Sequence, residues 1–316
     1  MDLVTSILAI TIRAGTSLVF ATIGEIFTER AGILNLGIEG MMLMGAVTGL
    51  TVSYYSGNLV LALLAAGIVG MIMALIHAWL SVSMRANQVV SGLSLTLFGT
   101  GFASFLGQRL GPASNSLRLI GLKAPKFIPL ELGALGNIPI VSAFLEQDIL
   151  TYLVYLLIPA SWYFLYKTRP GLWLRSVGED PQTADAMGID VIKTKYIYTL
   201  VGGFFAAIGG AHLSLSYTPG WSENITGGRG WIVIALVIFS MWNPARAIWG
   251  ALLFGGINAV QFRLQASGTN IPANFLNMLP YAGTIAVLVL MTWWEALSKK
   301  VGAPASLGVA YMREDK

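Results

Sequence analysis

Long apolar runs, separated by short polar breaks, recur along the whole chain. An α-helix needs about 20 mostly apolar residues to cross ~30 Å of hydrocarbon, and most of the runs approach that length. The run at 231–242 is short and ends at Trp242-Asn243-Pro244, so it is interpreted either as a span or as half of a broken or re-entrant helix. The pattern predicts an all-α integral membrane fold, a polytopic helical bundle of about 8–9 transmembrane segments. We expect these segments near residues 3–27, 33–55, 59–83, 88–108, 149–167, 196–217, 231–242, 246–265 and 280–298.

Composition points the same way. Of 316 residues, 55% are hydrophobic and 11% are charged, whereas a soluble domain carries roughly 25% charged residues. The 36 glycines suit a membrane bundle, in which small residues let helix backbones approach closely. The chain has no cysteine, which excludes disulfides and thiolate chemistry. We therefore treat residues 1–316 as a single transmembrane domain.

Basic residues are distributed unevenly about the predicted spans. Because cytoplasmic loops are enriched in Lys and Arg, the side with more of them is predicted to be cytoplasmic. That side comprises Arg30, Arg85, Lys167, Arg169, Arg175, Lys193, Lys195, Arg246, Lys299, Lys300, Arg313 and Lys316. The other side has Arg109, Arg118, Lys123, Lys126, Arg229 and Arg263, and Arg13 lies inside the first span. These positive charges are scattered between spans rather than gathered on one face, which argues against a nucleic-acid partner.

This orientation assigns the longer polar segments to sides. The N-terminus and the loop 109–148 are predicted to be extracytoplasmic, and the loop 169–194 and the tail 299–316 cytoplasmic. The loop 109–148 is interpreted either as a docking site for a binding protein or as an ordinary connection.

A helix signature lies inside the polar segment 169–194. Asp180 is a suitable N-cap, Pro181 fits the first helical position, and Gly188 suits a left-handed residue just past the helix end. The spacing predicts a two-turn helix from Pro181 to Met187. A helix this short is unstable in water unless it is held by other contacts.

The apolar residues of this short helix suggest what holds it. Ala184, Met187 and the chain around Ile189 and Val191 give it an apolar side. This side is interpreted either as packing into a groove on a cytoplasmic partner or as folding back on the bundle of the chain itself. The helix alone favours neither interpretation.

Three blocks of the chain carry a family signature. The first is GEIFTERAGILNLGIEGM at 24–41, the second is GLWLRSVGEDPQTADAMGIDV at 171–191, and the third is GRGWIVIALVIF at 228–239, followed by WNP at 242–244 and GALLFG at 250–255. In this order they resemble the permease family of ABC importers for simple sugars, nucleosides and branched-chain amino acids, especially its nucleoside branch. Departures are modest: Asp180 stands where the family often has Asn, Trp231 where Phe is usual, and Ala245-Arg246 where Leu-Gly is common.

The resemblance implies a function and a set of partners. Such a subunit translocates nucleosides across the cell inner (plasma) membrane, or a simple sugar of the ribose or galactose type by the same machinery. It works with an ABC ATPase subunit, with a second permease that is commonly a different polypeptide, giving a heterodimer, and with a substrate-binding lipoprotein or periplasmic protein, in contact with membrane lipids. The chain lacks the Gly-x-x-x-x-Gly-Lys-Ser/Thr phosphate loop, so we expect no enzyme activity and no cofactor of its own. ATP and Mg²⁺ are expected on the partner.

The resemblance also implies an ATPase-coupling site in the second block. The expected coupling residues are Gly178, Glu179, Asp180, Pro181, Ala184, Met187 and Gly188. On this interpretation the short helix lies in a groove of the ATPase and turns closure of the ATPase pair into movement of the spans.

Polar residues within the apolar runs are the candidates for the substrate pathway. They are Asn35, Glu39, Asn87, Gln88, Asn258 and Gln261, with Ser91 beside them. A charge at such a place is costly unless it faces a partner group or water, so Glu39 is interpreted either as a pathway residue or as an ion-pair partner of Arg13. The amides could equally tie helices together by hydrogen bonds.

Two other classes of protein are less consistent with the sequence. A secondary transporter would be expected to show coupling-ion ligands or a strong internal repeat, and an intramembrane enzyme a paired nucleophile and base. His77 and His212 are isolated in the sequence and have no carboxylate at metal-ligand spacing. We therefore expect no metal site and assign both to packing.

Overall fold

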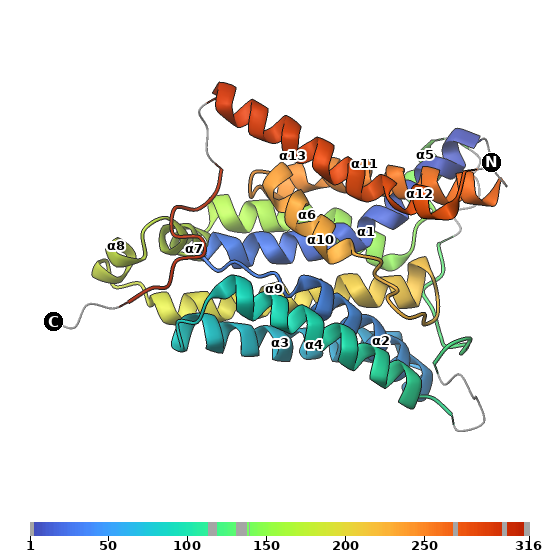
Figure 1. Ribbon diagram of the computed structural model, residues 1–316, viewed down its shortest axis with the longest axis horizontal. Helices are drawn as coiled ribbons and strands as arrows, with labels where there is room; N and C mark the ends of the chain where they lie inside the picture. Colours follow the sequence, from blue (N-terminus) through green and yellow to red (C-terminus); the bar gives the residue numbers. More distant parts are fainter. Residues whose placement is uncertain are drawn as a thin grey trace.

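A computed structural model describes residues 3–112, 119–130, 138, 140–267, 271–298 and 302–312. Helices account for most of this part of the chain (Figure 1). They are α1 (Leu3–Arg30), α2 (Ile38–Ser56), α3 (Leu59–Ala78) with a π-helical continuation η1 (Trp79–Ser83), α4 (Gln88–Arg109), α5 (Val141–Leu145), α6 (Ile149–Lys167), α7 (Arg169–Glu179), α8 (Pro181–Ala186), α9 (Val191–His212) with a π-helical continuation η3 (Leu213–Tyr217), α10 (Arg229–Phe239), α11 (Pro244–Ala266), α12 (Ala273–Asn277) and α13 (Leu279–Ser298).

The predicted apolar runs all coincide with helices. Within the described residues, 6 helices are long and apolar enough to cross a membrane: α1, α3 with η1, α4, α6, α9 with η3, and α11. The run expected at 231–242 overlaps the 11-residue helix α10, which begins at Arg229 and is followed by a turn through residues 240–243. The chain is therefore a mostly helical membrane bundle in which α10 is too short to cross alone.

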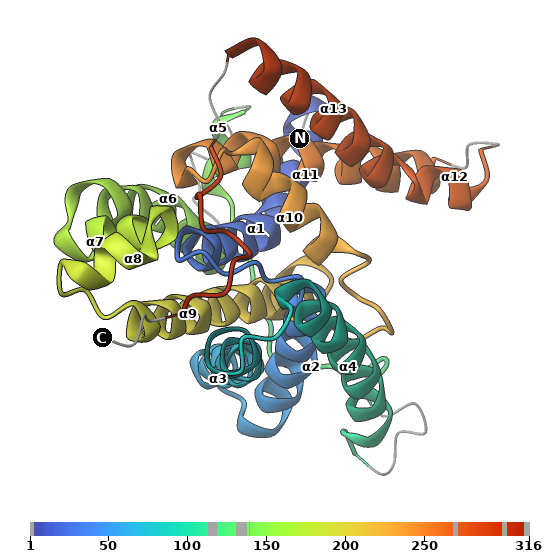
Figure 2. The same ribbon diagram turned by 60° about the vertical axis from the view of Figure 1, so that its left-hand side comes forward.

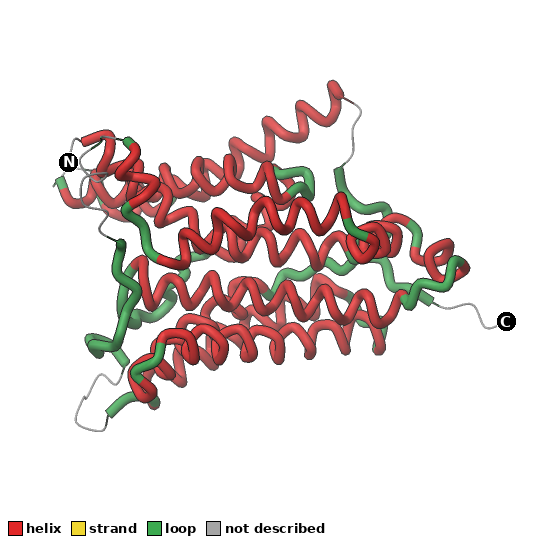
Figure 3. The backbone as a smooth tube through the Cα atoms, turned by 180° about the vertical axis from the view of Figure 1, so that it is seen from behind, coloured by secondary structure: helices red, strands yellow, loops and turns green. Residues whose placement is uncertain are grey.

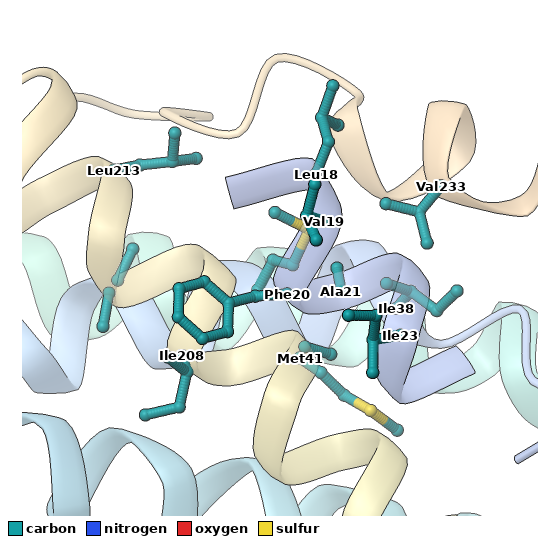
Figure 4. Packing of buried hydrophobic residues seen from close by; sticks show 14 of the residues in the cluster. Leu18, Val19, Phe20, Ala21, Ile23, Ile38, Met41, Ile208, Leu213 and Val233 are labelled. Carbon is teal, nitrogen blue, oxygen red and sulfur yellow. The ribbon is translucent and has the colours of Figure 1, made fainter. Parts of the chain in front are cut away.

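Helix α1 is the central element of the bundle. It packs along α9 and α11 and also contacts α10, while α9 in turn packs against α2 and α3 (Figure 2). The close-up in Figure 4 shows Leu18 and Phe20 of α1 among side chains of α2, α9 and α10. Both side chains are almost fully buried, so the core lies around α1.

Glycines allow the central helices to approach closely. A Cβ atom at Gly24 of α1 would lie 2.7 Å from the carbonyl oxygen of Gly202 in α9. A Cβ at Gly203, the residue after Gly202 in α9, would overlap with Gly70 and Ala74 of α3. Because membrane helices associate through close packing rather than hydrophobic exclusion, these glycines are what permits the contact of α9 with both neighbours.

The two ends of the bundle differ. The N-terminus, α5 and α12 lie at one end, whereas α7, α8 and the described end of the C-terminal segment lie at the other (Figures 1 and 3). Arg30, the last residue of α1, is at the α7–α8 end, where it meets Glu179. Of the basic residues used to predict orientation, Arg118, Lys299, Lys300, Arg313 and Lys316 lie outside the described residues, as do parts of the loop 109–148 and of the tail 299–316.

Candidate functional site

Two capped helices form the polar loop between α6 and α9. Thr168 caps α7, accepting a hydrogen bond from the N–H of Gly171 (3.2 Å). Asp180 caps α8: one carboxylate oxygen accepts from the N–H groups of Gln182 and Thr183 (3.1 Å each), and the other accepts from the Thr183 hydroxyl (2.5 Å). These hydrogen bonds hold the pKa of Asp180 below its ordinary value.

The far end of α8 also has the geometry that its sequence predicts. The helix spans Pro181–Ala186, with Met187 as its C-cap, and is one residue shorter than expected. Gly188 follows with φ +81°, and its N–H donates to the carbonyl of Asp185 (2.9 Å). A left-handed residue here closes the helix, so α8 is bounded by its own capping residues on both sides.

The apolar residues of this segment divide between two environments. Ala184 and Val191 are buried and pack with Val177 of α7 in a small cluster that Tyr311 of the C-terminal segment also covers. Met187 is 78% exposed. Ala184 and Val191 therefore follow the interpretation in which the segment folds back on its own chain, since they pack α8 against α7, whereas Met187 remains exposed.

The C-terminal segment ties α7 to the end of α1. Ser306 donates its N–H to the carbonyl of Gly178 (2.9 Å), and its hydroxyl donates to the same carbonyl (2.7 Å). The N–H of Gly308 donates to the carbonyl of Gly32, just past α1 (3.3 Å). Residues of the predicted cytoplasmic tail thus bridge α7 and the turn that follows α1.

Arg30 joins the same region to the turn after α10. Its guanidinium lies 3.8 Å from the carboxylate of Glu179, the last residue of α7. It also donates to the carbonyls of Trp242 (3.2 Å) and Met241 (3.4 Å). Met241 and Trp242 have φ of +51° and +54°, a left-handed conformation that is uncommon for residues other than glycine. The contacts of Arg30 therefore stabilise an unusual turn at the end of α10.

Glu39 holds the opposite end of α10. It lies in the first turn of α2, and its carboxylate accepts hydrogen bonds from the Thr226 hydroxyl (2.5 Å) and from the N–H groups of Gly228 (2.9 Å) and Gly230 (2.6 Å). A carboxylate at this place satisfies N–H groups that a helix start leaves free and also meets the positive end of the helix dipole. These three hydrogen bonds account for the carboxylate of Glu39, and the described residues show no ion pair between Glu39 and Arg13.

Asn258 and Gln261 of α11 are brought together in a cavity of ≈ 330 Å³. The other polar residues that line it include Tyr217 of η3, Arg229 of α10, Asn277 of α12 and Tyr281 of α13. Gln261 donates to the side chain of Asn277 (2.8 Å), and Asn258 to the carbonyl of Phe254 (2.9 Å). Two of the predicted pathway residues therefore share a polar space at the start of the short helix.

The other predicted pathway residues are elsewhere and have partners within the chain. Asn35 donates to Glu25 (3.3 Å) and accepts from the N–H of Gly37 (2.9 Å), Gln88 accepts from the N–H of Leu34 (2.7 Å), and exposed Asn87 caps α4. Ser91 contacts the His77 ring (3.0 Å). These hydrogen bonds join α1, α2, α3 and α4. Four of the predicted pathway residues therefore do not line the cavity that holds Asn258 and Gln261: Asn35, Glu39, Asn87 and Gln88.

Sequence reasoning missed several buried charged residues. Glu25 and Glu29 are almost completely buried in α1, and Glu29 accepts from the indole N–H of Trp242 (2.5 Å). His212 does have a carboxylate neighbour, since its Nε2 lies 3.6 Å from Asp148. The position of Glu25 and Glu29 within an apolar run could have indicated that they are buried. The contact between His212 and Asp148 joins two helices that are distant in sequence, so no local sequence signal indicates it. Within the described residues, no three His, Asp or Glu side chains gather as a metal site.

Comparisons with known proteins fit this architecture. Residues 7–291 match the family model described as branched-chain amino acid transport system / permease component. The chain is 40% identical to "Putative glucose ABC transporter permease protein TsgC13" of Haloferax volcanii, over 99% of both chains. It is 36% identical to the nucleoside ABC transporter permease protein NupC of Lactococcus lactis, over 94% of both, and 32% identical to the guanosine ABC transporter permease protein NupQ of Bacillus subtilis, over 99% of both. The chain belongs to the family of permease components of branched-chain amino acid transport systems.

Proposed function

We propose that this chain is a membrane-spanning subunit of an ATP-driven importer in the cell inner (plasma) membrane, and that its solutes are nucleosides. The observation that carries the proposal is the pair of capped helices α7 and α8, which project from one end of the bundle between two long apolar helices. Their place in the family's second sequence block supports contact with an ABC ATPase subunit. With α2 and α13 counted beside the six long helices the spans number eight, and α10 as a partial span would make nine.

The surface around α8 suits a protein partner. Met187 is 78% exposed, and Leu172 and Trp173 of α7 are 53% and 50% exposed. A cavity of ≈ 400 Å³ lies between Trp173, Met187 and the start of α9. Exposed aromatic and Met side chains beside a concave surface are favourable contact residues, which supports docking of the ATPase at this end of the bundle.

Contacts within the chain offer a route from α8 to the spans. Movement of α7 and α8 would be transmitted through Glu179 to Arg30, and from Arg30 to the turn at Met241 and Trp242. The C-terminal segment adds a second connection, from Gly178 through Ser306 towards α1. Energy from ATP would thus reach α10 by mechanical contact, and no chemical step by this chain is required.

The assembly follows from the family. We expect a second permease, in most cases a different polypeptide, two ATPase subunits and a substrate-binding protein that docks at the end of the bundle opposite α8. The part of the loop 109–148 that is described lies at that end, with Phe127 donating its N–H to the carbonyl of Leu215 (2.9 Å). ATP and Mg²⁺ would be held by the ATPase subunits.

A simple sugar is the second candidate solute. The relative from Haloferax volcanii named as a glucose permease is 40% identical, whereas the two nucleoside relatives are 36% and 32% identical. Nucleosides remain our proposal because the first sequence block, at residues 24–41, resembles the nucleoside branch. Both candidates are uncharged and rich in hydroxyl groups.

Uptake with competitors tests the solute. Cells that carry the intact transport system, with and without this gene, would be supplied with radiolabelled nucleoside in the presence of unlabelled nucleosides, ribose, galactose or glucose. We expect uptake to be lost without the gene and to be reduced by competing nucleosides alone. Competition by a sugar alone would assign the chain to the sugar branch, and uptake that does not depend on the gene would refute the nucleoside proposal.

A further inference from the structure

We infer that the cavity between η3, α10, α11 and α13 is a place where the permease itself contacts the solute during translocation. This inference rests on the proposed transport function and adds to it a site and its chemistry. Six polar residues define the site, which we call the α10 cavity: Tyr217, Arg229, Asn258, Gln261, Asn277 and Tyr281. Its volume of ≈ 330 Å³ is at the lower end of the ~300–1,000 Å³ typical of small-molecule sites.

Gln261 has hydrogen-bonding capacity that the chain does not use. Its residue is only 6% exposed, and its Nε2 donates to Asn277. Its Oε1 is buried and has no hydrogen-bond partner. Because a buried acceptor without a partner has lost its hydrogen bonds to water, a solute hydroxyl or N–H that reaches this oxygen would recover a hydrogen bond that the chain does not supply.

Arg229 gives the α10 cavity a fixed cationic wall. Its guanidinium donates to the carbonyl of Ala14 (2.9 Å) and to the Ser17 hydroxyl (3.2 Å) of α1. Its Cζ lies 4.9 Å from the centre of the Tyr217 ring. These contacts position the group before any solute arrives, and a fixed positive charge in a low-dielectric wall repels cations. The carboxylate of Glu39, which could otherwise attract a cation, is occupied by three hydrogen bonds.

The wall favours an uncharged solute with hydroxyl groups and a planar part. Asn258, Gln261 and Asn277 present amide groups that can both donate and accept hydrogen bonds. Tyr217, Tyr281 and Phe262 add aromatic surface around the same space, and aromatic faces stack on planar heterocycles. A nucleoside combines both features, whereas a simple sugar would use only the amides and Arg229.

The location agrees with a transient rather than a closed binding site. The α10 cavity lies where a short helix begins inside the bundle, and irregular backbone at such depth is tolerated where it borders protein or a water-filled path. Tyr281 and Phe262, on its outer side, are 43% and 46% exposed. The cavity is therefore lined by buried polar groups on the side of α1 and α10 and is open on the side of α13.

Single-cysteine labelling tests this inference directly, because the chain contains no cysteine of its own. Gln261→Cys would place a thiol in the α10 cavity. Gln265→Cys is the matched control: Gln265 lies one turn further along α11 and donates to the same Asn277 oxygen (3.1 Å), but it is partly exposed and does not line the cavity. Both variants would be assembled into the complete importer in proteoliposomes and treated with methyl methanethiosulfonate, a small uncharged thiol reagent that the positive charge of Arg229 does not repel.

We expect the transported solute to slow labelling at position 261 and to leave position 265 unchanged. With solute at ten times its half-saturating concentration, slowing of up to about tenfold follows from site occupancy. A solute that is not transported should have no effect. The inference would be overturned if the solute slowed labelling equally at both positions or did not slow it at position 261. It would also be overturned if the reagent never labelled the thiol at position 261.

A functional comparison uses the same pair of positions. Gln261→Leu and Gln265→Leu each remove one hydrogen bond to Asn277, so their structural losses are similar. We expect maximal uptake to fall in Gln261→Leu alone, while the affinity of the binding protein for solute and the rate of ATP hydrolysis are retained. Equal uptake by both variants would overturn the role of Gln261. If the wild-type complex imports a sugar rather than nucleosides, the nucleoside proposal fails, and the labelling test run with that sugar still decides whether solute enters the α10 cavity.

Discussion

Replacement of Glu39 by Gln should loosen the start of α10. The carboxylate accepts three hydrogen bonds, two on one oxygen from Thr226 and Gly228 and one on the other from Gly230. Glutamine keeps the size of the side chain but has a single acceptor oxygen. In its best orientation it retains the two bonds to Thr226 and Gly228 as neutral bonds, and its amide N–H₂ then faces the N–H of Gly230.

The magnitude follows from these contacts. Losing one charge-assisted hydrogen bond costs about 1.5–3 kcal/mol, and weakening two others from charged to neutral costs roughly 0.5–1 kcal/mol each. The sum is about 2.5–5 kcal/mol, which is roughly two to four powers of ten in the equilibrium for local opening.

Hydrogen exchange at the amides of Gly228 and Gly230 is the appropriate assay, because it reports opening of this turn alone. We expect Glu39→Gln to speed exchange there by roughly 100-fold or more. Glu223→Gln is a suitable control, since Glu223 is exposed and accepts one hydrogen bond from Gln108 (2.8 Å). Exchange at Gly228 and Gly230 that is unchanged in Glu39→Gln would refute the assignment of Glu39 as the group that holds α10.

Three further predictions concern packing and coupling. Gly203→Ala should destabilise the bundle in detergent unfolding by about 1–3 kcal/mol because its Cβ would overlap with α3, whereas Gly101→Ala, with nothing within 4 Å, should be neutral or stabilising; equal effects would contradict the close approach of α9 and α3. Asp180→Ala should weaken α8 and lower uptake, whereas Asp180→Asn should keep the cap and the activity; equal uptake by both variants would exclude a role for the cap. Because the pKa of Asp180 is lowered, the stabilisation from its ionised cap should persist above about pH 4 and be lost as the pH falls through the lowered pKa. Arg30→Gln should reduce solute transported per ATP, because it releases both the turn after α10 and the contact with Glu179. Glu179→Gln weakens only the first contact of this route, a half-exposed ion pair worth about 0–1 kcal/mol, and should reduce the ratio less; an unchanged ratio in Arg30→Gln would exclude transmission through this residue.

The capping residues of α8 show what local sequence can predict. Asp180, Pro181 and Gly188 act within a few residues of where they stand, so their identities were enough to locate the helix ends. The same holds for the membrane helices, whose apolar runs are visible without knowledge of their neighbours. The short run at 231–242 could be recognised as unusual for the same reason.

The packing of the helices could not be predicted in this way. A membrane helix is apolar on the side that faces lipid as well as on the side that faces protein, so the pattern does not identify the buried face. The partners of Glu39 at Thr226 and Gly230, and of His212 at Asp148, lie far away in sequence and carry no signal of their pairing. The packing of Ala184 was left open for a related reason, because an apolar residue on a short helix packs equally well against its own chain or a partner.

Coupling of ATP hydrolysis to transport through α8 is tested most directly by a pair of glycine substitutions. Gly188 at the end of α8 and Gly57 at the end of α2 have φ of +81° and +68°, and a Cβ at either would meet nothing within 4 Å. Valine at either position therefore strains the backbone by a similar amount, about 1–3 kcal/mol, without steric overlap. The measurement is solute transported per ATP hydrolysed by the reconstituted importer. We predict that Gly188→Val lowers this ratio while the complex still assembles and that Gly57→Val leaves it at the wild-type value; an unchanged ratio in Gly188→Val, or an equal loss in both variants, would contradict coupling through α8.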